Sequence, residues 1–188
     1  MLTLFPVEPV LPEGFTYTPD FLSEEEENGL IATISDIELQ TFIFQGYEAK
    51  RKFASFGMDY SFTHRKLKRG NPIPDRLIHL VEKVSNHLAL PPASIGELLI
   101  LEYPPGAAIN WHRDAPPFDI IIGLSLLSNC VFKLRPHDKN KQGRNSIISL
   151  PVGRRSLYVM RGPVRSEWQH STAPVKDTRY SITLRTLH

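Results

Sequence analysis

Near the end of the 188-residue chain stands the sequence RYSITLR, residues 179–185. Side chains along a β-strand point alternately to the two faces of a sheet, so a strand here places Arg179 and Arg185 on the same face. The apolar residues of the stretch then form the opposite face. Burying two arginines without partners would be costly. A bound dicarboxylate would remove that cost, because a guanidinium grips a carboxylate through two parallel hydrogen bonds.

The sequence before this stretch is rich in short β-strands. Turn sequences such as Pro104-Pro105-Gly106, Lys141-Gln142-Gly143 and Pro151-Val152-Gly153 separate runs of β-forming residues. The predicted strands cover residues 97–103, 108–111, 119–127, 130–135, 146–150, 156–160, 167–170 and 180–186. About eight short antiparallel strands are typical of a jelly roll. We therefore expect a mainly β (α+β) fold, a jelly roll or double-stranded β-helix preceded by helices.

Two helices are expected in the N-terminal half. Ser23 and Glu26 form a capping box before an acidic first turn, and this helix should end near residues 35–36. A second helix should cover Asp75–Leu88, after a proline-containing break at residues 71–74. Its expected core-facing residues are Leu77, Ile78, Leu80, Val81, Val84 and Leu88.

Length and composition indicate one globular domain over residues 1–188. We expect residues 1–90 to provide an arm and helices, and residues 91–188 to form the β-roll. The prolines of residues 1–20 indicate an extended arm that lies on the body of the protein. Cys130 is the only cysteine, which excludes an internal disulfide and a cysteine-based zinc site, and we expect its thiol to be buried.

Charge and hydropathy narrow the class of protein further. The net charge of +2 permits a polyanionic partner but does not require one. No run of 18 apolar residues occurs, and residues 1–12 lack the basic start and apolar core of a signal peptide. We therefore expect a cytoplasmic protein, or a nuclear one in a eukaryote, with no membrane contact and a monomeric state.

A candidate metal site consists of His112, Asp114 and His170. His112 and Asp114 stand two positions apart at the end of a predicted strand, so both side chains point to the same face. His170 ends another predicted strand. Two histidines and one carboxylate leave coordination positions open and suit non-haem iron(II). A His-x-Asp pair alone is common in a chain with seven histidines, so the weight rests on His170 and the arginine strand.

Residues 39–69 interleave aromatic and basic side chains. Such a pattern can stack nucleic-acid bases and neutralise phosphates. The candidate stacking residues are Phe53, Phe56 and Tyr60, and Arg65–Arg69 is a candidate phosphate contact. A half-buried hairpin with solvated lysines explains the same pattern, and the stretch by itself favours that explanation.

Two segments carry a family resemblance. One runs from Leu101-Glu102-Tyr103-Pro104-Pro105-Gly106 to His112-Arg113-Asp114, and the other from His170 to residues 179–185. Over residues 97–187 the chain resembles the AlkB family of iron(II)- and 2-oxoglutarate-dependent dioxygenases. We expect an enzyme of that kind.

The resemblance extends more weakly to residues 56–61 and 72–74, which look like the family's substrate-side loop and the break after it. It implies that residues 1–90 include a substrate-side hairpin or nucleotide-recognition lid. Residues 91–188 would be the jelly-roll core that holds the metal and the co-substrate.

The resemblance also implies individual roles in binding 2-oxoglutarate. Arg179 would hold the distal carboxylate, helped by the Tyr103 hydroxyl, and Arg185 would lie near the carboxylate beside the keto group. Two positions depart from the family pattern, which commonly has Asn where this chain has Leu101 and Ser181. Each departure removes an amide from the co-substrate pocket.

The implied catalytic residues are the iron ligands His112, Asp114 and His170, with 2-oxoglutarate and O2 as co-substrates. Oxidative decarboxylation of 2-oxoglutarate to succinate and CO2 would be coupled to hydroxylation of a substrate C–H bond. On an N-methyl group, the hydroxylated product loses formaldehyde and leaves a demethylated base. The cofactor supplies the oxidising chemistry, and the protein places the C–H bond and excludes water.

The resemblance implies alkylated DNA or RNA as the partner. A base inside a duplex cannot reach a metal at the bottom of a roll, so the base would have to be single-stranded or flipped out. Trp111 is a further candidate stacking residue, and a core position beside the metal strand explains it equally well. One alternative keeps the iron chemistry but acts on a protein or small molecule. Another is a metal-free β-roll that only binds a partner.

Overall fold

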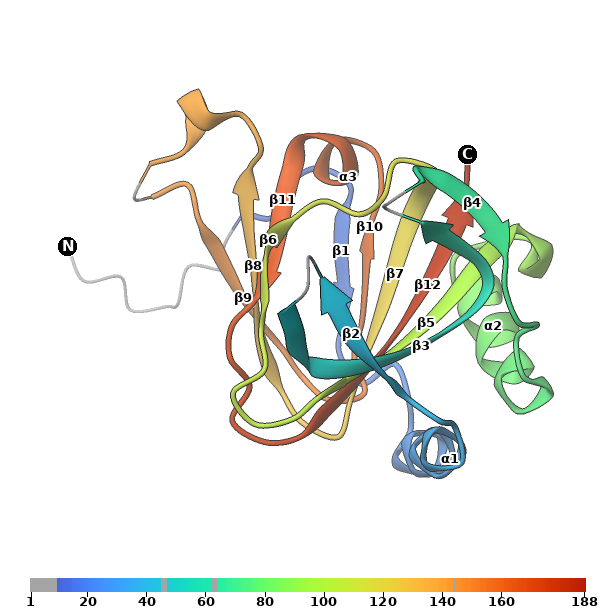
Figure 1. Ribbon diagram of the computed structural model, residues 1–188. Helices are drawn as coiled ribbons and strands as arrows, with labels where there is room; N and C mark the ends of the chain where they lie inside the picture. The colour runs from blue at the N-terminus through green and yellow to red at the C-terminus, as the bar shows by residue number, and fades with distance from the viewer. Residues whose placement is uncertain (1–9, 45–46, 62–63, 144) are drawn as a thin grey trace.

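The computed structural model describes residues 10–44, 47–61, 64–143 and 145–188, and it confirms the jelly roll (Figure 1). The larger antiparallel sheet contains, in spatial order, β1 (Phe15–Thr18), β10 (Leu157–Met160), β7 (Phe118–Leu126), β12 (Arg179–Leu187), β5 (Ile95–Tyr103), β3 (Tyr47–Ser61) and β2 (Gln40–Phe44), with β4 (Lys66–Arg69) beside β3. The smaller sheet contains β6 (Ile109–His112), β11 (Trp168–Thr172), β8 (Cys130–Pro136) and β9 (Ile148–Val152). The helical segments are α1 (Glu24–Ser35), α2 (Asp75–His87), α3 (Pro163–Glu167) and the 3-10 turns Pro92–Ser94 and Lys139–Lys141.

All eight predicted strands are confirmed as β5 to β12, with ends displaced by at most two residues. The largest correction is at β9, where Pro151 and Val152 lie inside the strand although the sequence predicted a turn there. β9 is an edge strand that pairs only with β8. Proline is tolerated on such a strand because its missing amide hydrogen would have pointed away from the sheet.

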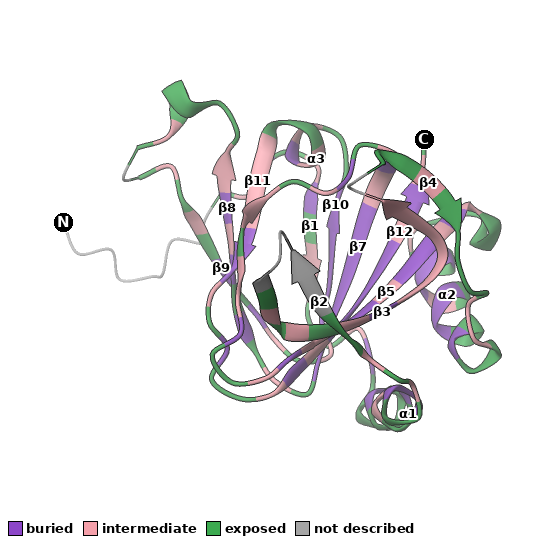
Figure 2. Cartoon of the chain, in the orientation of Figure 1, coloured by how far each residue is buried: buried purple, intermediate pink, exposed green. Residues whose placement is uncertain are grey.

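The larger sheet separates two apolar cores. Ile182 and Leu184 of β12 pack with buried residues of α1 and α2 on one face. On the other face Arg179 lies over Tyr103 and Arg185 over Phe118, both of which belong to the core between the two sheets. The alternation predicted for β12 is therefore confirmed, and Figure 2 shows that the central strands of this sheet are largely buried.

Both predicted helices are confirmed. The Ser23 hydroxyl accepts from the Glu26 amide, and the Glu26 carboxylate accepts from the Ser23 amide, which is the expected capping box. α1 ends at Ser35, as predicted, and α2 buries most of its expected apolar stripe. Ile78 is an exception, since it is 37% exposed and does not face the core. No helix among the described residues is long and apolar enough to span a membrane.

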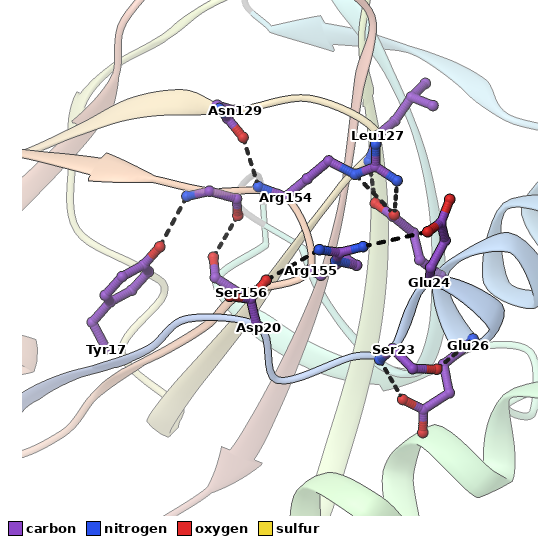
Figure 3. A network of polar contacts seen from close by, with 12 residues as sticks. Tyr17, Asp20, Ser23, Glu24, Glu26, Leu127, Asn129, Arg154, Arg155 and Ser156 are labelled. Carbon is purple, nitrogen blue, oxygen red and sulfur yellow. Dashed lines mark hydrogen bonds and ion pairs between the residues drawn. The ribbon is translucent and has the colours of Figure 1, made fainter.

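Glu27 fastens α1 to the β-roll. Its fully buried carboxylate accepts from the Leu127 amide at 2.8 Å and from Arg154 Nε at 3.0 Å and Nη2 at 2.5 Å. Figure 3 shows the polar network around this contact, with Leu127 beside the guanidinium of Arg154. Leu127 has a φ of 72°, a conformation that is uncommon for a branched residue. The Glu27 contact therefore stabilises an unfavourable turn as well as the helix position.

The N-terminal half contributes more to the sheet than the sequence indicated. Phe15–Thr18, expected as part of an arm, forms β1 and pairs with β10. β3 is a long strand that pairs first with β5 and then, beyond Gly57, with β4. Gly57 has a φ of 86°, and a Cβ there would lie 2.4 Å from the Gly96 carbonyl oxygen. Only glycine fits this bend, which directs the end of β3 away from the sheet.

Candidate metal and co-substrate site

Neighbouring strands of the smaller sheet bring two of the predicted metal ligands together. His112 ends β6 and is paired with His170 of β11, and their ring centroids are 4.2 Å apart. His112 Nδ1 lies 2.8 Å from the Asn110 carbonyl oxygen. Because a carbonyl only accepts, Nδ1 is the donor in this contact, and Nε2 is the ring nitrogen that the contact leaves available for a metal. Phe132 stacks on the His170 ring, with centroids 5.4 Å apart, and fixes its orientation.

Asp114 follows β6 by two residues, and its two carboxylate oxygens have different surroundings. Oδ1 accepts from Arg185 Nη2 at 2.6 Å. Oδ2 lies 3.5 Å from His170 Nε2, and this buried oxygen has no hydrogen-bond partner among the described residues. Burial is the largest single influence and raises the pKa of Asp114, but Arg185 and the other basic groups around the carboxylate together outweigh burial and hold that pKa below its usual range. Asp114 is therefore an ionised carboxylate with one oxygen available.

His170 is the neutral partner of this carboxylate. Burial lowers the pKa of His170 to about 3, and the charge of Asp114 opposes the shift only in part. At neutral pH the imidazole therefore carries no charge and retains a lone pair.

Arg185 bridges two carboxylates. Its Nη2 donates to Asp114, and its Nη1 donates to Glu97 Oε2 through a short ion pair. Glu97 also accepts from the Ser55 hydroxyl at 3.1 Å. Burial raises the pKa of Glu97, and Arg185 offsets this shift only in part. The Arg185 Nε group is buried and has no hydrogen-bond acceptor within the described ranges of the chain.

Arg179, the first arginine of the strand, is 2% exposed. Its Nε donates to the Ser125 hydroxyl at 2.9 Å, and its guanidinium lies 5.0 Å from the centre of the Tyr103 ring. Among the residues that the structure describes, no carboxylate pairs with Arg179. Ser181, two residues further along the same face, is also buried and stands beside Ser125 and Leu101 in the strand pairing. A buried cation of this kind indicates a binding place for an anion.

Arg165 holds the loop that follows Asp114. Its Nη2 donates to the carbonyl oxygens of Ala115 at 2.7 Å and Phe118 at 2.8 Å. Arg165 belongs to α3, a short helix that the sequence reading missed. The Gly162–Pro163 pair could have indicated it, because proline is favoured at the first position of a helix.

The structure separates the four candidate stacking residues. Phe53 and Tyr60 pack at the core between the sheets, whereas Phe56 packs at the core beneath the helices. Trp111 lies under the Arg135 guanidinium, 4.4 Å from the ring centre, on the face of the smaller sheet opposite to His112. Their roles in substrate binding stay predictions, and only Phe53 and Tyr60 lie on the side of the candidate site.

No three His, Cys, Asp or Glu side chains among the described residues are already arranged as a metal site. The geometry instead shows the candidate ligands held by protein contacts: Asp114 by Arg185 and His112 by Asn110. The assignment of His112, Asp114 and His170 as ligands therefore stays a prediction. Glu97 was missed as a member of the site because its proximity to Arg185 depends on how β5 and β12 are paired.

Comparisons with known proteins define the class. Residues 14–185 match the family model of the 2OG-Fe(II) oxygenase superfamily. The chain is 30% identical over 173 residues to the mouse tRNA (carboxymethyluridine(34)-5-O)-methyltransferase ALKBH8. This match covers 88% of this chain and 25% of that protein. It is 29% identical over 155 residues to the mouse RNA demethylase ALKBH5, covering 69% of this chain and 38% of that protein. The chain thus spans less than half the length of either relative.

The fold agrees with these matches. The solved structure of OsALKBH1 superposes with a TM-score of 0.70 at 14% identity, over 95% of this chain and 99% of that one. The family model and the sequence relatives identify an AlkB-like iron(II)- and 2-oxoglutarate-dependent dioxygenase. The chain belongs to the 2OG-Fe(II) oxygenase superfamily.

Proposed function

We propose that this AlkB-like oxygenase removes N-alkyl groups from DNA or RNA bases, with iron(II) held by His112, Asp114 and His170. One observation carries the proposal: in the part of the chain that the structure describes, the buried Asp114 Oδ2 has no hydrogen-bond partner, and it lies 3.5 Å from His170 Nε2. An orphaned buried carboxylate oxygen is costly in a native structure. A metal ion at this point would pair with it, and two imidazoles with one carboxylate are the donor set that suits iron(II).

Two further groups support 2-oxoglutarate as the co-substrate. Arg179 is a buried guanidinium with no carboxylate beside it in the described part of the chain, and Tyr103 adds a hydroxyl nearby. Arg185 keeps a buried Nε hydrogen without a partner. A dicarboxylate would satisfy both arginines, since each prefers a carboxylate acceptor. Ser181, where the family commonly has Asn, provides a hydroxyl, and Ser125 beside it in the strand pairing provides another.

When bound, iron(II) with 2-oxoglutarate and O2 supplies the oxidation of a C–H bond, which forms an N-hydroxymethyl group together with succinate and CO2. Loss of formaldehyde from that group leaves the demethylated base. The residues of this chain bind and orient the reactants. Arg179 would anchor the co-substrate, Arg185 holds Asp114, and Phe132 packs against the His170 ring.

A nucleic-acid substrate is supported by the relatives and by the β3–β4 hairpin. ALKBH5 is named an RNA demethylase and ALKBH8 a tRNA methyltransferase. The β4 strand, Lys66–Arg69, carries three cations in four residues and is mostly exposed. Lys68 forms an exposed ion pair with Asp59 at 3.2 Å, which is weak enough to exchange for a phosphate. Phe53 and Tyr60 belong to β3 and pack on the side of the site.

The test is formaldehyde and succinate release on a panel of methylated oligonucleotides and nucleosides, with iron(II), 2-oxoglutarate and O2. With at least one oligonucleotide, we expect the wild-type protein to release formaldehyde and succinate in equal amounts. The variant His112→Ala should release neither product. His79→Ala, at an exposed histidine of α2, is the matched control and should retain turnover. Succinate formation without oligonucleotide binding at low salt would reject the nucleic-acid substrate, because phosphate contacts strengthen as salt falls.

A further inference from the structure

A continuous line of polar contacts joins the substrate-side strand to the candidate metal ligand. It begins at Ser55 on β3, passes through Glu97 on β5 and Arg185 on β12, and ends at Asp114. Glu97 and Arg185 are direct partners in the pairing of β5 with β12. The side chains of Glu97 and Asp114 are 5% and 3% exposed. Glu97 thus occupies a buried position beside the site, although no role in binding iron or 2-oxoglutarate requires it.

The contacts made by Glu97 determine how Arg185 can meet Asp114. A guanidinium that faces a single carboxylate commonly binds both of its oxygens at once. Here Nη1 is taken by Glu97, so Arg185 contacts Asp114 through Nη2 and Oδ1 alone. Asp114 Oδ2 is left without a hydrogen bond and lies next to His170. The position of Glu97 therefore accounts for the availability of the oxygen that a metal would need.

Ser55 makes the arrangement more rigid. Its hydroxyl donates to Glu97 Oε1, so each oxygen of this carboxylate has a donor, one from β3 and one from β12. A carboxylate held on both oxygens cannot rotate without breaking a buried hydrogen bond, which is costly. Glu97 consequently holds Arg185 in one orientation.

We infer that Glu97 is a positioning residue for the metal centre, which acts through Arg185 to hold Asp114 with one oxygen free for the metal. The inference rests on the proposed iron site. It assigns to Glu97 no contact with metal or substrate. Outer contacts that orient metal ligands commonly matter for affinity almost as much as the ligands themselves.

The experiment measures Mn(II) binding, as a redox-stable substitute for iron(II), to wild type and Glu97→Gln by electron paramagnetic resonance of the free ion. Glu97→Gln keeps the size of the side chain but removes its charge. We expect the Mn(II) dissociation constant to rise by about 10- to 100-fold, as is typical of contacts that orient a ligand. The melting temperature is recorded for the same samples.

Glu27→Gln is the matched control, because Glu27 is another buried glutamate paired with one arginine, but it lies on α1 away from the site. We expect it to lower the melting temperature and to leave Mn(II) affinity unchanged. Folded Glu97→Gln with an Mn(II) affinity within twofold of wild type would reject the positioning role. If Glu97→Gln does not fold, Glu97→Asp replaces it. Its shorter side chain withdraws from Arg185, and unchanged affinity would again reject the inference.

Mn(II) binding by the wild-type protein distinguishes a failure of this inference from a failure of the proposed function. If wild type binds no Mn(II), the proposed metal site is wrong and the positioning role is wrong with it. If wild type binds Mn(II) and Glu97→Gln binds it equally well, only the positioning role is wrong. Steady-state kinetics give an independent readout. High iron(II) concentrations should restore the turnover of Glu97→Gln, whereas they should not restore the turnover of a variant that lacks a metal ligand.

Discussion

Arg185 and Asp114 form a one-sided ion pair: Nη2 binds Oδ1 at 2.6 Å, while Oδ2 stays buried without a hydrogen bond. This asymmetry connects the arginine strand to the His-x-Asp segment. The same guanidinium that secures the carboxylate also restricts it to one free oxygen. The pair therefore combines a structural role, which is the neutralisation of a buried arginine, with a role in presenting a metal ligand.

Asp114→Asn should abolish metal binding. The amide has the shape of the carboxylate but no charge, and it cannot serve as an anionic ligand. Loss of a contact that only orients a ligand typically lowers metal affinity by about 10- to 100-fold. We expect Asp114→Asn to lower Mn(II) affinity by more than that, and we expect succinate formation to fall to background. Asp119→Asn, at an exposed aspartate of β7, is the control and should leave both unchanged. Full turnover of Asp114→Asn with iron(II) would contradict the ligand assignment.

Arg179→Met should raise the KM for 2-oxoglutarate while kcat changes little at saturation. The substitution retains the apolar part of the side chain but removes the donors for the distal carboxylate. A hydrogen bond to a charged group contributes about 1.5–3 kcal/mol, which corresponds to roughly 10- to 150-fold in KM. The KM is measured from the steady-state rate of succinate formation at a series of 2-oxoglutarate concentrations. Arg76→Met, at an exposed ion pair with Asp36, should show no change. Equal KM values for Arg179→Met and wild type would remove Arg179 from the co-substrate site.

Glu27→Ala should destabilise the fold without affecting metal binding. It leaves the Leu127 amide and the Arg154 guanidinium without their acceptor, and a buried donor without a partner costs about 1–3 kcal/mol. Urea unfolding followed by circular dichroism measures the change in free energy. Glu25→Ala, on the exposed side of the same helix turn, should stay within about 1 kcal/mol of wild type. If both variants unfold at the same urea concentration, the Glu27 contact does not fasten α1.

Two glycine-to-alanine substitutions should shift stability in opposite directions. At Gly123 in β7, a Cβ would lie 2.1 Å from Cζ of Tyr158, so Gly123→Ala displaces that buried ring and should cost about 1–3 kcal/mol. At Gly29 in α1, nothing lies within 4 Å of a Cβ, and Gly29→Ala should stabilise the helix by about 1 kcal/mol. Thermal unfolding of the two variants beside wild type tests the pair. A neutral Gly123→Ala would show that Tyr158 does not occupy the space above Gly123.

Cys130 should react slowly with a thiol reagent at neutral pH. Burial raises the pKa of Cys130, although the charge of Arg179 opposes the shift, so the reactive thiolate is depleted in the folded state. Because the unfolded chain releases this proton at a lower pH than the folded protein, the thiol contributes stability that is lost as pH rises above about 8.5. Labelling by a disulfide reagent at pH 7, with and without urea, measures the difference. Rapid labelling of the folded protein would contradict the burial of the thiol.

Local patterns were predictable wherever a short segment contains its own signal. The capping box of Ser23 and Glu26 and the alternation of residues 179–185 were both confirmed. The prediction that Ile78 faces the core was wrong, because an apolar residue at helical spacing can still lie at the edge of the buried stripe. The β9 boundary was wrong because a proline that usually indicates a turn is accepted in an edge strand.

By itself the sequence determined α1 and α2, the positions of β5 to β12 along the chain and the face on which the arginines of β12 lie, because these follow from the 3.6- and 2-residue periods of the chain and from its turn and capping residues. Only the tertiary structure decided that Glu97 meets Arg185, that His170 stands beside His112, and that Trp111 and Phe56 face away from the site. Those contacts depend on the register between strands that are distant along the chain. Register is fixed by the packing of both cores together, which no short stretch of sequence contains.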